Sequence, residues 1–359
     1  MAEHPFVVYT VEESLRNQAS SCTEVGSPLY GVLLEGLLAD HRRGGITARL
    51  LDGVTETPHH DALPLRYLAT GHLLALNGSA PQLARHYPSC GGSWDGSATV
   101  VDDFLATAVE HEAEFRIGVR RNVQTNEVGR AAVLASGFSL IAERHALPID
   151  QLEIGSSAGL LSRWNHYWYE TGESSTGTAG SRLVFGPEWW VSSAKPLLLT
   201  VDIARMRASD INPIDARSPE GRQTMLSFVW PDQVSRIDRL RSAFDLAADA
   251  PLAIDRSDAG TWLARELTDG PTVGAATVVF HSIVWQYLPR WTKDRVRQVI
   301  ASAGDVAGPE SPLLWLRMEP LDRDQAAVRL TTWPGQTDEV IARVGYHGAD
   351  IEWLAAETC

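Results

Sequence analysis

Residues 151–160 decide the fold: Gln151-Leu152-Glu153-Ile154-Gly155-Ser156-Ser157-Ala158-Gly159-Leu160. A short apolar strand ends near an acidic residue, small residues follow, and a helical pattern then begins. This layout is typical of a strand, a tight turn and a helix N-terminus, the place where α/β sheets bind ligands. Small residues let a ligand approach the backbone, and free N–H groups at a helix start favour negative charge. The stretch therefore predicts the ligand-binding turn of an α/β domain.

The chain after Leu147-Pro148 alternates apolar runs of strand length with helical segments. The expected strands are 151–154, 197–202, 252–255, 276–281, 313–318, 328–333 and 351–354, and the expected helices are 160–169, 223–248, 259–266 and 292–303. This alternation predicts a Rossmann-like α/β fold, a mostly parallel sheet with helices on both faces and an antiparallel edge at its last strands. Residues 172–180 contain few hydrophobic side chains and are expected to form a loop, either a lid or a surface insertion.

The chain before residue 148 has helical periodicity instead. Helices are expected over 29–39, 63–77, 101–120 and 127–145. Ser27-Pro28 supplies an N-cap and a proline at the first helical position of one of them. We therefore expect two domains, an N-terminal helical domain over 1–147 and a Rossmann-like domain over 148–359.

Composition limits the classes of partner. The 359-residue chain has a net charge of −14 and is 44% hydrophobic, which supports a large core and disfavours nucleic acid and anionic membranes. Its first residues lack the basic and apolar regions of a signal peptide, and no apolar run approaches about 18 residues. Cys22, Cys90 and Cys359 are far apart and form no zinc or disulfide pattern. These features predict a soluble cytoplasmic protein without a metal site.

The turn after the first expected strand carries candidate binding groups. Glu153, Gly155 and Gly159 would surround a bound molecule, and an acidic residue there suits a ribose or an amine. The hydroxyls of Ser156 and Ser157, beside helix N–H groups, suit an oxyanion such as phosphate or sulfate. In the alternative interpretation one of these serines only caps the helix.

A second polar cluster precedes the last helix of the N-terminal part. Its members are Arg121, Gln124, Thr125, Asn126, Glu127 and Arg130. Their amide, carboxylate and guanidinium groups suit an amino-acid-like substrate. Helix capping by Thr125 or Asn126, with Glu127 in the first turn, is the structural alternative.

Two acidic positions follow later strands. Asp202 and Asp210 end or follow the second expected strand, where a nucleotide-binding sheet places a ribose-binding carboxylate, although turn formation also explains them. Residues 255–259, Asp-Arg-Ser-Asp-Ala, follow the third expected strand and resemble a methyltransferase motif that lies beside adenine. They lack the glycine that precedes the aspartate in that motif.

His281 and Ser282 lie at the carboxyl end of another expected strand. A histidine in that place suits acid–base chemistry near neutral pH. Glu319, at the end of the next strand, is a weaker candidate of the same kind. A buried core histidine is the structural alternative.

Blocks along the whole chain resemble a large bacterial domain-of-unknown-function family with a Gln-Thr-Asn-Glu-Val-Gly-Arg signature. The blocks are 27–30, 86–89, 124–130, 152–160, 229–233, 279–282 and 347–349. The turn also resembles the first nucleotide-binding turn of class I methyltransferases, with Ser157 in place of the middle glycine. Members of the family typically have Asn and then Asp-Arg-Tyr after the turn. This chain has Leu161 and Asn165-His166-Tyr167, which points to altered chemistry and adds Asn165 to the candidate binding residues.

The chain is also similar to aziridine-forming enzymes of azinomycin-type biosynthesis, which act with a small partner protein. This resemblance implies a natural-product enzyme, without a cofactor, in which an amine of a small amino-acid-derived substrate displaces sulfate. Glu127, Glu153 or His281 would take the proton, and Arg121 or Arg130 would help the serine turn to hold the sulfate. The candidate substrate-binding residues are Arg121, Gln124, Thr125, Asn126, Arg130, Gly155, Ser156, Ser157, Gly159, Asn165, Asp210 and Ser282.

Two other functions fit the same motifs. A methyltransferase that uses S-adenosylmethionine is favoured by the strand order and the turn, but not by Ser157. A non-catalytic subunit that binds a metabolite or a partner would explain the degenerate motifs.

Overall fold

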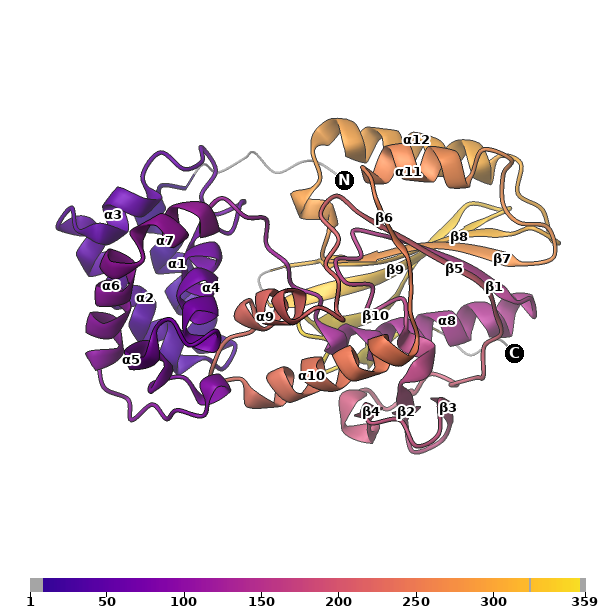
Figure 1. The fold of residues 1–359 in the computed structure, drawn as a ribbon. Helices are drawn as coiled ribbons and strands as arrows, with labels where there is room; N and C mark the ends of the chain where they lie inside the picture. Colours follow the sequence, from indigo (N-terminus) through magenta and orange to yellow (C-terminus); the bar gives the residue numbers. More distant parts are fainter. Residues whose placement is uncertain (1–8, 323, 356–359) are drawn as a thin grey trace. The chain divides into compact units, whose positions relative to one another are not determined.

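The computed structural model describes residues 9–322 and 324–355 and divides into two compact units (Figure 1). The helical unit comprises Met1–Thr125 and Ser218–Asp238, and the α/β unit comprises Asn126–Arg217 and Arg239–Cys359. The first boundary between the units therefore follows Thr125 instead of residue 147, and the helical unit includes a second segment, Ser218–Asp238. The expectations for the first eight residues and for Cys359 lie outside the described residues. None of the described helices is both long and apolar enough to cross a membrane.

The helical unit is built from short helices around one apolar core. Its elements are α1 (Val11–Glu24), α2 (Pro28–Arg42), α3 (Ile46–Leu51), α4 (Leu63–Leu76), α5 (Pro81–Ala84), η1 (Pro88–Cys90), α6 (Thr99–Glu110), α7 (Glu112–Gly118), α9 (Pro219–Ser227) and the start of α10 (Val234–Asp249). Helix α1 begins with a capping box, in which Thr10 Oγ1 accepts from Glu13 N at 3.2 Å and Glu13 Oε2 accepts from Thr10 N at 2.8 Å. The helix expected over 101–120 is two helices, which meet at His111.

The segment 218–238 joins the helical unit through buried polar contacts. Ser27 Oγ donates to Asp232 Oδ1 at 2.6 Å, and Asp232 Oδ2 accepts from Leu29 N at 3.2 Å. Burial raises the pKa of Asp232. Ser89 N donates to Pro231 O at 2.9 Å. The helix expected over 223–248 is interrupted here, because Pro231 has no backbone N–H to continue it.

The α/β unit is centred on an eight-stranded sheet. Its strands are β1 (Ile149–Ile154), β5 (Ile203–Asp210), β6 (Ile254–Arg256), β7 (Ala276–Ser282), β8 (Leu313–Pro320), β9 (Gln325–Trp333), β10 (Thr337–Gly345) and β11 (Glu352–Trp353), in the order β11-β10-β9-β8-β7-β1-β5-β6. The strands β6-β5-β1-β7-β8 are parallel, and β9, β10 and β11 add antiparallel pairs. The expected mostly parallel, Rossmann-like α/β class is confirmed. The strand expected over 197–202 is wrong, since β5 begins at Ile203, and β10 was not expected.

Helices cover both faces of this sheet. Figure 1 shows α11 (Ala259–Glu266) and α12 (Arg290–Gly304) along one face and α8 (Ala131–His145) along the other. Side chains of a strand alternate between the two faces. Leu152, Val279 and Trp315 belong to the apolar cluster of the α11/α12 face. Glu153 is in register with Phe280, whose ring contacts Phe138 of α8 at 5.3 Å, so these side chains face α8.

A small sheet is inserted between β1 and β5. It contains β2 (Trp168–Glu170), β3 (Ser175–Gly177) and β4 (Val184–Phe185), in the order β3-β2-β4. The segment expected to be a loop, 172–180, therefore contains a strand. Ser174 and Thr176 fix it, because Leu198 N donates to Ser174 Oγ at 2.9 Å and Thr176 Oγ1 donates to Leu199 O at 2.5 Å.

Two glycines let backbone segments of the α/β unit touch. A Cβ atom on Gly129 would lie 2.2 Å from His347 O, and one on Gly348 would lie 2.3 Å from Gly129 C and O. Gly348 also has φ +89°, which other residues rarely adopt. The 124–130 and 347–349 blocks are therefore brought together by backbone contact.

We expect Gly348→Ala to lower the free energy of unfolding by at least about 2 kcal/mol, because it adds both backbone strain and a clash. Urea unfolding followed by tryptophan fluorescence measures this loss. Gly308→Ala is the matched control, because its Cβ would lie 3.8 Å from Ser311 Oγ and its φ is not positive. Equal midpoints for the two variants would contradict the close approach.

Candidate functional site

The turn after β1 does not lead into a helix. Gly155, Ser157 and Gly159 have φ values of +66°, +53° and +64°. Alternate residues in the left-handed region prevent the chain from starting a right-handed helix. The helix expected over 160–169 is therefore wrong: turns follow, and then the short 3-10 helix η3 (Trp164–His166).

The backbone amides of this bend are bound by other parts of the α/β unit. Ser157 N donates to Asp210 Oδ2 at 2.8 Å, and Leu160 N donates to Asn126 Oδ1 at 2.8 Å. Ser156 N donates to Ser209 O at 3.0 Å. These amides are not the open donors at a helix start that the sequence predicted. Asp210, predicted to bind a ribose, holds the bend instead.

The carbonyl groups of the bend are also bound by side chains. Arg163 Nη1 donates to Ala158 O at 3.1 Å and to Gly159 O at 2.7 Å, and Tyr167 Oη donates to Leu160 O at 2.6 Å. Arg163 and Tyr167 were not among the predicted site residues. The signal that would have found Arg163 is a single charged residue within an apolar stretch, where burial requires partners.

Glu153 lies inside the α/β unit beneath this bend. Its side chain is buried, and burial raises its pKa to about 8. Ser162 Oγ donates to Glu153 Oε2 in a short hydrogen bond. Glu153 is therefore protonated at neutral pH, and it is not an ionised partner for a ribose or an amine there.

The predicted polar cluster at 121–130 is divided between the two units. Arg121, Gln124 and Thr125 belong to the helical unit, where Arg121 is exposed and Gln124 is buried. Asn126 belongs to the α/β unit and holds Leu160, as described above.

Glu127 and Arg130 have structural partners in the α/β unit. Glu127 Oε1 accepts from Gly129 N at 3.1 Å and lies 3.8 Å from Arg239 Nη1. Arg130 Nε donates to Tyr346 O at 2.9 Å, and its Nη1 donates to Ser282 O at 3.3 Å. Arg130 therefore connects the carboxyl end of β7 with the segment that follows β10.

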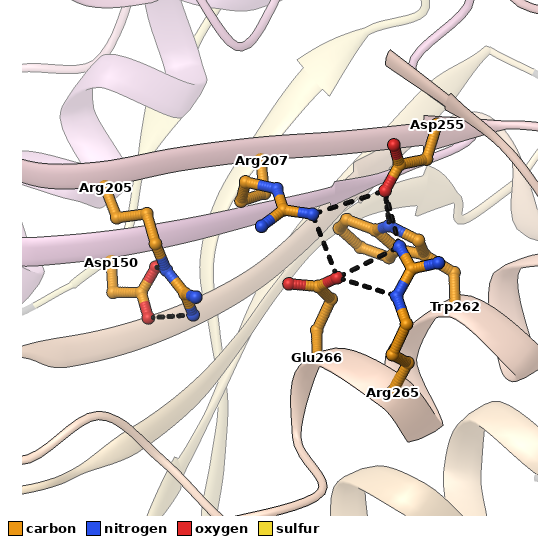
Figure 2. Close-up of polar contacts among 7 residues, drawn as sticks. All are labelled: Asp150, Arg205, Arg207, Asp255, Trp262, Arg265 and Glu266. Atoms are coloured by element: carbon orange, nitrogen blue, oxygen red, sulfur yellow. Dashed lines mark hydrogen bonds and ion pairs between the residues drawn. The ribbon is translucent and has the colours of Figure 1, made fainter. Parts of the chain in front are cut away.

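The predicted motif at 255–259 is part of an ion-pair network (Figure 2). Asp255 Oδ2 accepts from Trp262 Nε1 at 2.9 Å and from Arg207 Nη2 at 3.3 Å. Arg207 also donates to Glu266 Oε1 at 3.1 Å. The hydrogen bond from Trp262, with the two arginines Arg265 and Arg207, lowers the pKa of Asp255. This network joins β5, β6 and α11. Asp258, the aspartate of the Asp-Ala pair predicted to lie beside adenine, instead caps α11, where its Oδ1 accepts from Thr261 N at 3.0 Å.

The strongest candidate for acid–base chemistry lies at the carboxyl ends of β7 and β8. His281 Nδ1 contacts Glu319 Oε1 at 2.6 Å, and the same oxygen accepts from Val284 N at 3.0 Å and Trp285 N at 3.2 Å. A carboxylate that binds Nδ1 requires the proton there, which leaves Nε2 of the neutral ring as an acceptor. His281 is 0% exposed, and its Nε2 has no partner among the described residues.

Aromatic rings and a strained residue surround this pair. The His281 ring is stacked on Trp285 with a centroid distance of 5.4 Å and an interplanar angle of 15°. Ile283 has φ +52°, which is a true outlier for a β-branched residue. Such strain is concentrated at functional sites.

Arg317, the neighbour of His281 on β8, has a hydrogen-bond donor without a partner among the described residues. Arg317 is paired in register with His281 across β7 and β8. Its Nη2 donates to Thr331 Oγ1 and to Asp338 Oδ1, at 2.7 Å each, whereas its buried Nε has no partner among the described residues. A ligand that loses a proton to His281 and presents an anionic group to Arg317 would satisfy both.

The structure does not unite the three predicted catalytic residues. Glu153 points to the α8 face, and His281 is on the same face as Val279, beneath α11 and α12. Glu127 has structural partners near the start of α8.

Asn165, on η3, has a buried Oδ1 without a partner among the described residues. The described chain also contains no group of three or more metal-ligating side chains.

The pKa of Glu153 predicts a pH dependence of stability. This pKa is about 8 in the fold, whereas an ordinary glutamate has a pKa of 4.5, so over this range the folded chain retains a proton that the unfolded chain loses. The contribution of Glu153 to the free energy of unfolding is therefore greatest below pH 4.5. Above that pH it falls by about 1.4 kcal/mol per pH unit, until the pH reaches the pKa of Glu153 in the folded protein. Urea unfolding between pH 5 and 8 measures that slope.

The neutral variant Glu153→Gln should flatten this dependence and be more stable than the wild type near pH 8. Glu310→Gln, at an exposed position, is the control and should keep the wild-type slope. Parallel curves for all three proteins would show that Glu153 is ionised in the fold.

Comparison with known proteins adds one relationship. A family model described as "Uncharacterized protein conserved in bacteria (DUF2332)" matches residues 12–353, nearly the whole chain. No curated protein and no solved structure matches the chain.

Proposed function

The chain belongs to this family of uncharacterised bacterial proteins, and we propose that its α/β unit is an enzyme in which His281 is the general base. The observation that carries the proposal is the contact of 2.6 Å between His281 Nδ1 and Glu319 Oε1, together with the buried Nε2, which has no partner in the described part of the chain. Glu319 is a positioning residue: it selects the tautomer and is itself held by two backbone N–H groups.

The position of the dyad supports this proposal. In sheets of this type ligands bind outside the carboxyl ends of the strands, where the strand order reverses. The reversal lies between β1 and β7, because the chain builds β5 and β6 on one side of β1 and β7 and β8 on the other. His281 stands at the end of β7, next to that point.

The most specific reaction that we propose is closure of an aziridine ring on a small amino-acid-derived substrate. His281 Nε2 takes a proton from the substrate ammonium, and the freed nitrogen lone pair forms the C–N bond. The C–O bond to sulfate breaks, the electron pair leaves with the sulfate, and the second nitrogen proton passes to water. Arg317 would stabilise the departing anion, in place of the amides of Ser156 and Ser157. This reaction needs no cofactor.

The simplest probe is 2-aminoethyl hydrogen sulfate, with sulfate release as the readout. We expect His281→Gln to lower kcat/KM by about 10²–10⁴-fold, the range typical of a lost general base. Glu319→Gln should cause a loss of similar order and a displaced pH–rate profile, because glutamine can also donate to Nδ1 and so permits the wrong tautomer.

His145→Gln, in the last turn of α8, is the matched control and should retain wild-type turnover. Wild-type turnover by His281→Gln would reject the base assignment. Sulfate release by none of the proteins would reject ring closure on this class of substrate.

A methyltransferase is the second candidate, because the parallel strands have the 3-2-1-4-5 order. Calorimetry with S-adenosylmethionine separates the two functions. Saturable binding would favour methyl transfer, whereas ring closure predicts no heat of binding.

A further inference from the structure

A cavity lies in the α/β unit, along α8 and the small sheet. Its volume is about 250 Å³, and its walls include Leu140 and Glu143 of α8, Glu173 from the turn before β3, Lys195 and Trp353 of β11. It lies on the α8 face of the large sheet, opposite the face that carries His281. An inference about it therefore does not depend on the proposed function.

Charges of both signs line this cavity. Lys195, one of two lysines in the chain, donates from Nζ to Trp190 O, which fixes its ammonium group in the wall. Glu143 is partly buried, and its carboxylate has no hydrogen bond or ion pair with any residue that the structure describes. The Glu173 carboxylate, at the exposed rim, is likewise unpaired within the described chain. A cavity wall with charges of both signs suits a ligand that carries both charges.

Apolar groups complete the walls. Leu140 and Trp353 are 5% and 6% exposed, and Pro196 is buried. Ligand pockets are commonly about 300–1,000 Å³. A cavity of about 250 Å³ therefore suits a ligand smaller than a nucleotide.

We propose that this cavity binds a free α-amino acid with an apolar side chain. The ligand carboxylate pairs with Lys195, its ammonium group pairs with Glu143 and Glu173, and its side chain packs against Leu140 and Trp353. A zwitterion satisfies both signs of charge at once. A simple amine would leave the Lys195 ammonium without a counter-charge, and a simple carboxylate would leave the Glu143 carboxylate without one.

Isothermal calorimetry with L-leucine tests this proposal. The wild type should bind L-leucine, and it should bind both leucinamide and 4-methylpentanoate at least about 10-fold more weakly, because each lacks one charge. Lys195→Met and Glu143→Gln should each weaken L-leucine binding by about 10-fold or more. Lys293→Met and Glu310→Gln are matched controls outside the cavity and should bind like the wild type.

A second measurement uses the native sequence and does not depend on how the variants fold. Reductive methylation with ¹³C-formaldehyde labels both lysines and keeps their charge. On addition of L-leucine the Lys195 signal should shift and the Lys293 signal should not. Absence of L-leucine binding, or equal shifts of both signals, would overturn the proposal, as would equal affinity for leucine and leucinamide.

Discussion

The α/β unit depends on a bend whose backbone is hydrogen-bonded by side chains instead of by a helix. The amides after β1 are bound by Asp210 and Asn126, and the carbonyls are bound by Arg163 and Tyr167. These residues come from three segments, since Arg163 and Tyr167 both flank η3, so the bend joins the start of the unit, β5 and η3. A buried backbone group without a partner costs free energy, which explains why the polar residues around the bend serve the fold first.

This use of polar groups changes where chemistry is possible. The sequence placed the binding site at the bend, where acidic and hydroxyl groups are densest. Within the described residues, buried polar atoms without a partner occur at Ser156 Oγ in the bend and also at His281 Nε2 and Arg317 Nε, on the next two strands. The neutral Glu153 and the ionic network of Asp255 have structural partners already.

Periodicity identified most elements but not their ends or their pairing partners. The apolar runs of β1, β7, β8 and β9 were found because buried strands have continuous or alternating apolar patterns. The sequence misplaces the start of β5, because Arg205 and Arg207 interrupt its apolar pattern. In the fold these arginines donate hydrogen bonds to acidic residues of other elements, namely Asp150, Asp255 and Glu266 (Figure 2). The helix at 160–169 was expected from spacing alone, and the left-handed residues that prevent it are set by tertiary contacts.

The sequence by itself determined the α/β class and the helical N-terminal part. It also suggested the bacterial family, through the Gln124–Arg130 signature, and His281 as a candidate for acid–base chemistry. These follow from local patterns, which are properties of short segments. Only the tertiary structure decided that segment 218–238 belongs to the helical unit, and that Glu153 and His281 lie on opposite faces of the sheet. It alone also brought Glu319 to His281. The physical reason is that hydrogen bonding and desolvation depend on which segments meet, and residues 38 positions apart in sequence meet only in the folded chain.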